Sequence, residues 1–164
     1  AEGGEFFYLP NENILLAGQC RNYLRGAEQM AEKLNVSNLH IINSSGYHLD
    51  TSISPIFNNE YDCIGLICAR EVFNNNEIND LRSICKSNQW ELIEIEHQDI
   101  NSSLSFRTAM NGLTLPGLFI GSKKLNQKPI SEFALSNNII FDSTSVSQFN
   151  LSGGSVHCLT NELF

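Results

Sequence analysis

The sequence has no long apolar run, no cluster of basic residues and no Cys-x-x-Cys pair. No stretch approaches the roughly 20 apolar residues that a membrane-spanning helix needs, so a membrane is not expected as a partner. Ten Lys and Arg residues are scattered among eighteen Asp and Glu residues, and the net charge is −8. Because binding to phosphates depends on clustered cations, this balance also disfavours nucleic acid.

The cysteines lack the pattern of a disulfide framework. They are five in number, which is odd, and none has the spacing of a zinc site. We therefore expect a reducing, cytoplasmic environment, with no metal and no cofactor. An initiator Met is also missing, since the chain opens on Ala-Glu-Gly-Gly at the approach to a strand. A chain trimmed at its start, or part of a longer protein, would begin in this way.

What the sequence does contain is an internal repeat. Its 164 residues, 41% hydrophobic and 17% charged, suit one globular domain over residues 1–164. Three times, two short apolar strands are followed by an amphipathic helix and another strand, with the helix starts 53 residues apart. A period of this length indicates stacked or radially arranged supersecondary units, so we predict an α/β fold of ββαβ units. The predicted elements are strands 5–9 and 14–18, helix 23–34 and strand 39–43; strands 52–57 and 62–68, helix 76–87 and strand 91–95; and strands 106–111 and 117–121, helix 129–137 and strand 138–142.

Local signals support parts of this assignment. The segment Pro10 to Asn13 predicts a hairpin turn between the first two strands. Asn22 is a suitable N-cap for helix 23–34, in which Leu24, Ala27, Ala31 and Leu34 fall on one face. The segment 73–77 reads as a loop and a helix cap.

Near the C-terminus, Cys158 follows His157, and three interpretations are open: a reactive nucleophile, a metal ligand together with His157, or an inert small side chain. If residues 155–160 form a strand, neighbouring side chains point to opposite faces, and His157 neither activates Cys158 nor shares a metal with it. Gly153 and Gly154 would allow a close approach of the backbone or a positive φ. The remaining thiols lie in apolar runs or on a helix face and are expected to be inert: Cys20, Cys63, Cys68 and Cys85.

A nucleophilic Cys158 needs a base from elsewhere in the chain. His48 follows the third strand of the first unit, and Asp50, two residues later, would share its face in an extended segment. An ordinary surface-loop histidine is the alternative. Glu2 stands before two glycines at the other end of the chain, where a glutamate is usually solvated. A radial arrangement of the units would bring these strand ends to a common axis.

Four motifs together resemble those of the guanidino-group-modifying superfamily, which includes arginine deiminases, agmatine deiminases, dimethylarginine dimethylaminohydrolases and amidinotransferases. EGGE at 2–5 looks like the family's E-G-G-D, and YHLDTSISP at 47–55 is similar to its H-L-D-T. GQCRNYLRGAEQMAEKL at 18–34 resembles its G-x-S-x-R-T-N-x-x-G-x-x-x-L, and GGSVHCLT at 153–160 its terminal G-G-G-x-H-C-x-T. The resemblance implies about three blades of a five-bladed α/β propeller, the pentein fold, without its N-terminal units.

The same resemblance implies roles for individual residues. Cys158 would be the nucleophile and His48 the general acid and base, while Glu2 and Asp50 would hold the guanidinium group. Arg21 would anchor a substrate carboxylate. The chain departs from the family pattern in three places: Glu5 stands for an aspartate, Ser155 stands for a glycine, and the threonine expected after Arg21 is missing. A further guanidinium-binding aspartate would belong to an upstream unit.

The leading hypothesis is a cysteine-dependent hydrolase of an arginine-like guanidino compound, or the C-terminal catalytic portion of one. An amidinotransferase that passes the amidino group to an amine is the first alternative. A non-catalytic module that binds a cationic metabolite or a protein partner is the second. A separate N-terminal part of the same protein is an expected partner, and the open edges of a partial propeller leave a homo-oligomer open as well.

Overall fold

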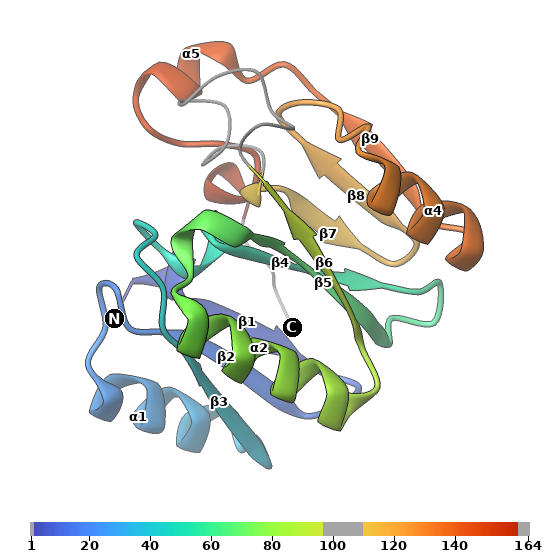
Figure 1. The fold of residues 1–164 in the computed structure, drawn as a ribbon. Coiled ribbons are helices and arrows are strands. Elements are labelled where there is room, and N and C mark those ends of the chain that lie inside the picture. The colour runs from blue at the N-terminus through green and yellow to red at the C-terminus, as the bar shows by residue number, and fades with distance from the viewer. Residues whose placement is uncertain (1, 97–109, 161–164) are drawn as a thin grey trace.

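The computed structural model describes residues 2–96 and 110–160 of the chain (Figure 1). Its strands form three separate three-stranded sheets, which follow one another from the bottom to the top of the view. The first unit contains β1 (Phe6–Leu9), β2 (Ile14–Gly18), α1 (Leu24–Leu34) and β3 (Asn38–Ile42). The second contains β4 (Ile53–Phe57), β5 (Cys63–Ala69), α2 (Asn75–Asn88) and β6 (Glu91–Ile95). The third contains β7 (Leu113–Leu115), β8 (Leu118–Gly121), α4 (Lys128–Asn137) and β9 (Ile140–Ser143), and the short helix α5 (Ser147–Leu151) follows it.

Each unit has the same topology. The first two strands pair antiparallel, and the third lies parallel to the second after the helical crossover. In the first unit Leu9 is opposite Ile14, so the hairpin turns at residues 10–13 as predicted. The three repeated sheets confirm the predicted α/β class and its ββαβ units.

The helices begin within one residue of the predicted positions. Capping interactions at their ends account for where they start and stop. Asn74 caps α2 by accepting the N–H groups of Asn76 and Glu77, and the Glu77 carboxylate accepts the N–H of Asn74 in return. The C-cap residue of each of the three long helices adopts the left-handed conformation, which closes the last turn: Asn35, Gln89 and Asn138.

Three local predictions are wrong in the described residues. Asn22 does not cap α1, whose N-cap is Tyr23 without a side-chain hydrogen bond. The apolar face of α1 is only partly buried, with Leu24 and Leu34 49% and 38% exposed and Ala27 fully buried. Met110 and Asn111 precede β7 instead of lying in a strand, and residues 106–109 lie outside the described part. Residues 155–160 form no strand, because the chain turns into a 3-10 helix at His157–Leu159.

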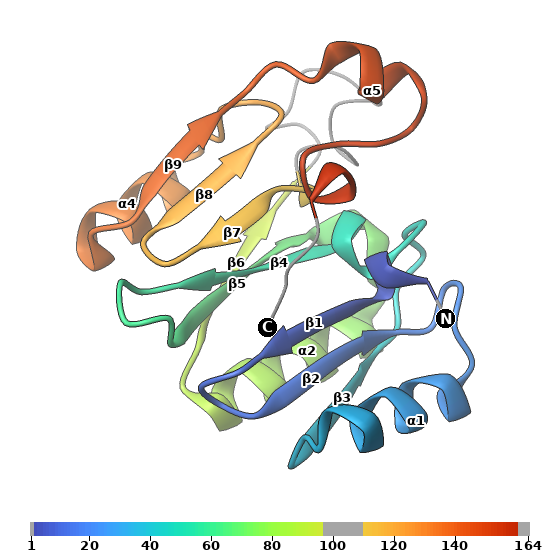
Figure 2. The same ribbon diagram turned by 180° about the vertical axis from the view of Figure 1, so that it is seen from behind.

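The core is shared between neighbouring units. In one cluster, Ile78, Leu81 and Cys85 of α2 pack between the sheet of their own unit and the sheet of the first unit. In the other, Ile130 and Phe133 of α4 pack against the second sheet in the same way. Each of these helices therefore packs against its own sheet and the preceding one; Figure 2 shows the three units from behind. The turns that join the units are thereby held in place.

No helix within residues 2–96 and 110–160 combines the length and the apolar character needed to cross a membrane.

Candidate active site

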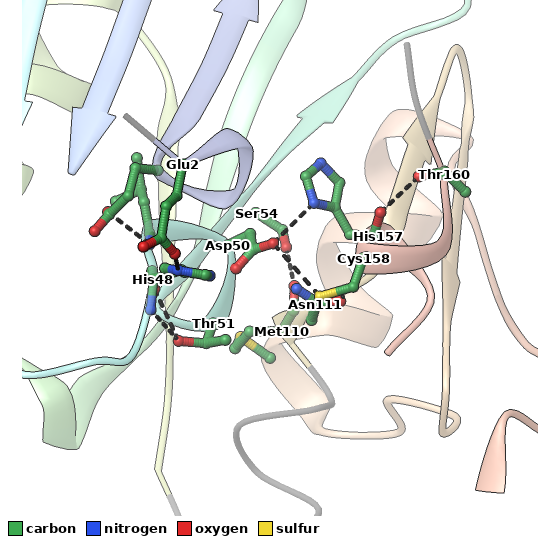
Figure 3. Close-up of polar contacts among 12 residues, drawn as sticks. Glu2, His48, Asp50, Thr51, Ser54, Met110, Asn111, His157, Cys158 and Thr160 are labelled. Carbon is green, nitrogen blue, oxygen red and sulfur yellow. Dashed lines mark hydrogen bonds and ion pairs between the residues drawn. The ribbon is translucent and has the colours of Figure 1, made fainter. Parts of the chain in front are cut away.

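Three turns from distant parts of the chain meet at one open cleft of about 680 Å³. They are the 3-10 turns Gly3–Glu5, Leu49–Thr51 and His157–Leu159. In Figure 3 the side chains of Glu2 and His48 lie to one side of Asp50, and those of His157 and Cys158 lie to the other. All five residues line the cleft.

Glu2 and His48 form the pair on the first side. The Oε2 atom of Glu2 lies 2.5 Å from Nε2 of His48. The histidine side chain is 16% exposed, whereas the Glu2 side chain is 52% exposed. Asn22 holds the backbone of Glu2, because its Oδ1 accepts the Glu2 N–H at 3.1 Å. The residue expected to cap a helix therefore ties the start of the chain to the cleft.

Asp50 is the buried carboxylate at the centre. Its Oδ2 lies 3.0 Å from Nδ1 of His157 and 3.9 Å from Sγ of Cys158. Its Oδ1 is buried and has no hydrogen-bond partner among the described residues. Because a carboxylate oxygen is a strong acceptor, an N–H donor from a ligand would satisfy it.

Gly4 allows the first turn to cover this carboxylate closely. A Cβ atom at this position would lie 2.8 Å from Nδ1 of His48 and 2.9 Å from Oδ2 of Asp50. Any larger residue would push the two side chains aside. Of the two glycines of the EGGE segment, Gly4 therefore serves close packing at the site, whereas a Cβ atom on Gly3 would meet no atom within 4 Å.

Glu5 has a structural position. It is fully buried, and its two carboxylate oxygens accept the backbone N–H groups of Arg21 and, at 3.1 Å, Leu49. One side chain thus joins the first turn, the segment after β2 and the turn that carries Asp50. These are charge-assisted hydrogen bonds, which are stronger than neutral ones.

Arg21 does not line the cleft in this structure. Its guanidinium group lies over the ring of Tyr47, 4.3 Å from the ring centroid. The ring of Tyr47 in turn lies 4.5 Å from that of His48. Arg21 is therefore adjacent to the site through Tyr47 and remains the one predicted site residue outside the cleft wall.

The turn that carries Cys158 differs most from the expectation. In a strand His157 and Cys158 would diverge, but in the 3-10 turn both approach the same oxygen of Asp50. Within the described residues, no strand accepts the N–H groups of His157 and Cys158. Asn111 takes them instead, with its main-chain oxygen bound to His157 N–H and its Oδ1 bound to Cys158 N–H, each at 3.1 Å.

His157 and Asn111 are the two site residues that sequence reasoning missed. His157 was set aside by the strand assumption, and its ring also packs 5.2 Å from that of Phe7. Gly153, with φ of +88°, was a signal that the strand assumption was weak, because it turns the chain just before the cysteine. Nothing in the sequence indicated a partner for Asn111.

Cys158 is exposed, and the other thiols are not. Burial raises the pKa of Cys63 and of Cys68, and it raises that of Cys85 to about 12. Cys20 is half-buried and donates its S–H to the Ser44 carbonyl, and burial raises its pKa as well. A thiol with a raised pKa forms little thiolate at neutral pH, which agrees with the expectation that these four are inert.

Across residues 2–96 and 110–160, no three His, Cys, Asp or Glu side chains are grouped so as to hold a metal ion.

Comparison with known proteins places the fold. Neither the sequence models of protein families nor the sequences of curated proteins give a match. Among solved structures, the N-terminal domain of ArgZ, a cyanobacterial arginine dihydrolase, superimposes in its product-bound form with a TM-score of 0.73 and 20% identity, over 96% of this chain and 54% of that one. The same domain has been solved covalently bound to a reaction intermediate, with a TM-score of 0.72 at 19% identity, over 95% of this chain and 53% of that one.

Two further structures show the same likeness. AgrE in a ternary complex with ornithine and NAD+ matches with a TM-score of 0.74 at 19% identity, over 95% of this chain and 21% of that one. Agmatine deiminase from C. jejuni matches with a TM-score of 0.63 at 16% identity, over 96% of this chain and 54% of that one. The chain therefore spans about half the length of the ArgZ domain and of the agmatine deiminase. Over nearly all of its own length it has the pentein fold of these guanidino-modifying enzymes, the superfamily that its four motifs resemble.

Proposed function

We propose that the chain is a cysteine-dependent hydrolase of an arginine-like guanidino compound, or the C-terminal catalytic portion of one. The observation that carries the proposal is the convergence of an exposed thiol, a buried carboxylate with an unpaired oxygen, and a histidine–glutamate pair on one cleft. The sequence motifs and the fold of the arginine dihydrolase and agmatine deiminase structures support it.

The cleft suits a cation on an alkyl stem. One end carries Asp50 and Glu2, whose carboxylates would accept hydrogen bonds from the guanidinium N–H groups. Along the wall lie apolar side chains that would contact methylene groups: Phe6, Tyr8, Leu15, Met30 and Leu34. Asp50 also keeps Oδ1, which is buried and has no partner among the described residues, as a further acceptor for such a substrate once this atom is uncovered. Arg21, next to Tyr47, would need to turn toward the cleft to meet a substrate carboxylate.

In the first half-reaction, the Cys158 thiolate attacks the central guanidinium carbon and forms a C–S bond. The C–N bond to the departing nitrogen breaks as His48 gives that nitrogen a proton, and ammonia or an amine leaves. The product on the enzyme is an amidino-thioether. The fixed negative charge of Asp50 beside the sulfur holds the cation in line for this attack.

In the second half-reaction, His48 removes a proton from a water molecule, and the oxygen attacks the same carbon. The C–S bond then breaks, the thiolate is restored, and a ureido product leaves. In this scheme Glu2, which contacts His48, moves from the imidazole to the substrate N–H groups.

A separate N-terminal part of the same protein is the proposed partner. The solved structures of similar fold are about twice as long as this chain or longer. The assay should therefore be run on this chain alone and on the full-length protein if the gene encodes one.

The test is release of ureido product and ammonia from arginine, agmatine and methylated arginines. Cys158→Ser should abolish turnover, because a hydroxyl does not ionise near neutral pH. The matched control Cys20→Ser should keep it, since Cys20 does not line the cleft. If the amidino group is transferred to glycine in preference to water, the activity is that of an amidinotransferase and not of a hydrolase. Unchanged turnover in Cys158→Ser would contradict both activities.

A second measurement does not need turnover. A haloacetamidine carries an amidinium that resembles guanidinium, so it should alkylate Cys158 at least tenfold faster than a neutral haloacetamide of the same leaving group. Excess substrate should protect the thiol. Equal rates for both reagents would instead favour a module without catalytic function.

A further inference from the structure

Asn111 is a buried asparagine, 1% exposed, in the segment that leads into β7. It makes two hydrogen bonds to consecutive residues of the turn that carries the thiol. Its main-chain carbonyl accepts the N–H of His157, and its side-chain Oδ1 accepts the N–H of Cys158, both at 3.1 Å. The preceding carbonyl, of Met110, accepts the hydroxyl of Ser54 on β4.

This arrangement matters because the C-terminal turn lies outside all three sheets. Among the described residues, its polar links to the rest of the fold are those to Asn111 and the contacts of His157 and Cys158 with Asp50. The Asp50 contacts act on side chains, whereas Asn111 holds the backbone on which the thiol is mounted. Through Ser54, the same segment is joined to the strand that follows the Asp50 turn.

We propose that Asn111 is a positioning residue that sets the thiol of Cys158 against Asp50 and the cleft. The inference rests on the proposed role of Cys158 as nucleophile. An asparagine suits this task because Oδ1 accepts one N–H without bringing a negative charge near the sulfur. Its Nδ2 is buried and has no partner among the described residues, so both N–H donors of the side-chain amide are unused.

The test uses two variants and two readouts that need no substrate. Asn111→Ala removes the acceptor, and the amide of Cys158 should exchange with solvent at least tenfold faster by NMR or mass spectrometry. Asn111→Asp keeps an acceptor oxygen, so it should restore protection of that amide. It also places a carboxylate near the sulfur, which should move the pH dependence of Cys158 alkylation up by about one pH unit.

The matched control is Asn137→Ala, because Asn137 donates to the carbonyl of Phe133 in α4 and does not line the cleft. It should leave both readouts unchanged. A folded Asn111→Ala protein whose Cys158 amide stays protected would overturn the proposal. If Asn111→Ala does not fold, Asn111→Asp decides by itself. A pH dependence of Cys158 alkylation that is the same as in the wild-type protein would then overturn the proposal.

In turnover, Asn111→Ala should lower kcat about 10- to 100-fold with little change in KM. The thiol is misplaced in this variant, while the protein carboxylates that bind the guanidinium group keep their positions. A wild-type protein without turnover on any guanidino compound would contradict the proposed function. The exchange and alkylation results would then still report separately on whether Asn111 holds the thiol.

Discussion

At the scale of single residues, two buried carboxylates near the cleft differ in how many of their oxygens accept hydrogen bonds. Glu5 has both oxygens occupied by backbone N–H groups, so it has no free acceptor for a ligand. Asp50 has one oxygen shared between His157 and Cys158 and the other without a partner in the described residues. A saturated buried carboxylate indicates a structural role, and the unsaturated one in the cleft supports the binding role proposed for Asp50.

The structural role of Glu5 gives a prediction about stability. Glu5→Gln keeps the shape of the side chain but turns an NH₂ group toward one of the two N–H donors. A buried N–H then loses its acceptor, and the free energy of unfolding should fall by about 2–3 kcal/mol in urea denaturation. The control Glu28→Gln, on the exposed side of α1, should change it by less than about 0.5 kcal/mol. A Glu5→Gln protein as stable as wild type would show that the two hydrogen bonds contribute little.

At the scale of elements, the strands determine the position of the site, and the turns between them carry its residues. None of the five cleft residues Glu2, His48, Asp50, His157 and Cys158 lies in a strand. His48 and Asp50 belong to the connection between β3 and β4, and this connection is stiffened by Thr51, whose hydroxyl donates to the carbonyl of His48 at 2.8 Å. The strands on either side determine where that connection starts and ends.

One of these strands carries a titratable group. His40 on β3 is half-buried opposite Leu16, and burial lowers its pKa below the usual value. The unfolded chain therefore binds more protons than the folded one between the two pKa values, so stability rises with pH there. The contribution is fully present above the unfolded value of about 6.5 and is lost as the pH falls below it.

We therefore expect the stability advantage of wild type over His40→Gln to shrink between pH 7.5 and pH 5.5. Urea midpoints measured for both proteins across this range give the difference, in which the other titrating groups cancel. A difference that stays constant, or grows as the pH falls, would contradict a lowered pKa for His40.

At the scale of the whole molecule, the site depends on all three units being packed together. Glu2 precedes the first unit, Asp50 lies between the first and the second, and Cys158 follows the third. The first two units share the core cluster around α2, and the last two share the cluster around α4. The turns at the cleft can meet only if both clusters are intact.

Leu81 of α2, 1% exposed, tests this coupling. Leu81→Ala leaves a cavity between the first two sheets and should lower the free energy of unfolding by about 3 kcal/mol. Fluorescence of Trp90, the sole tryptophan and a member of the same cluster, and circular dichroism should report one coincident transition. The control Leu135→Ala, 87% exposed on α4, should be nearly neutral. Two separate transitions in Leu81→Ala would show that the units unfold independently.

Features that depend on contacts between residues close in the sequence could be predicted, and features that depend on distant residues could not. Hydrophobic periodicity and turn residues are local, so the ββαβ repeat and the helix starts could be predicted. The cap at Asn74 was also predictable, because its partners lie two and three residues away. The failures at Asn22 and Asn111 have the reverse cause, since their partners are Glu2 and Cys158, 20 and 47 residues away.

The sequence by itself determined the repeating units. Through the resemblance of its four motifs it also predicted the residues that are proposed to act on a guanidinium group: a thiol, a histidine and two carboxylates. Only the tertiary structure decided that Cys158 sits in a 3-10 turn and that His157 shares Asp50 with it. It also decided that Arg21 rests on Tyr47 outside the cleft wall. For the turn the physical reason is hydrogen bonding: the backbone N–H groups at 157 and 158 find their acceptors on Asn111, which lies in none of the three sheets. For Arg21 it is the attraction between a guanidinium group and an aromatic ring that only the folded chain brings together.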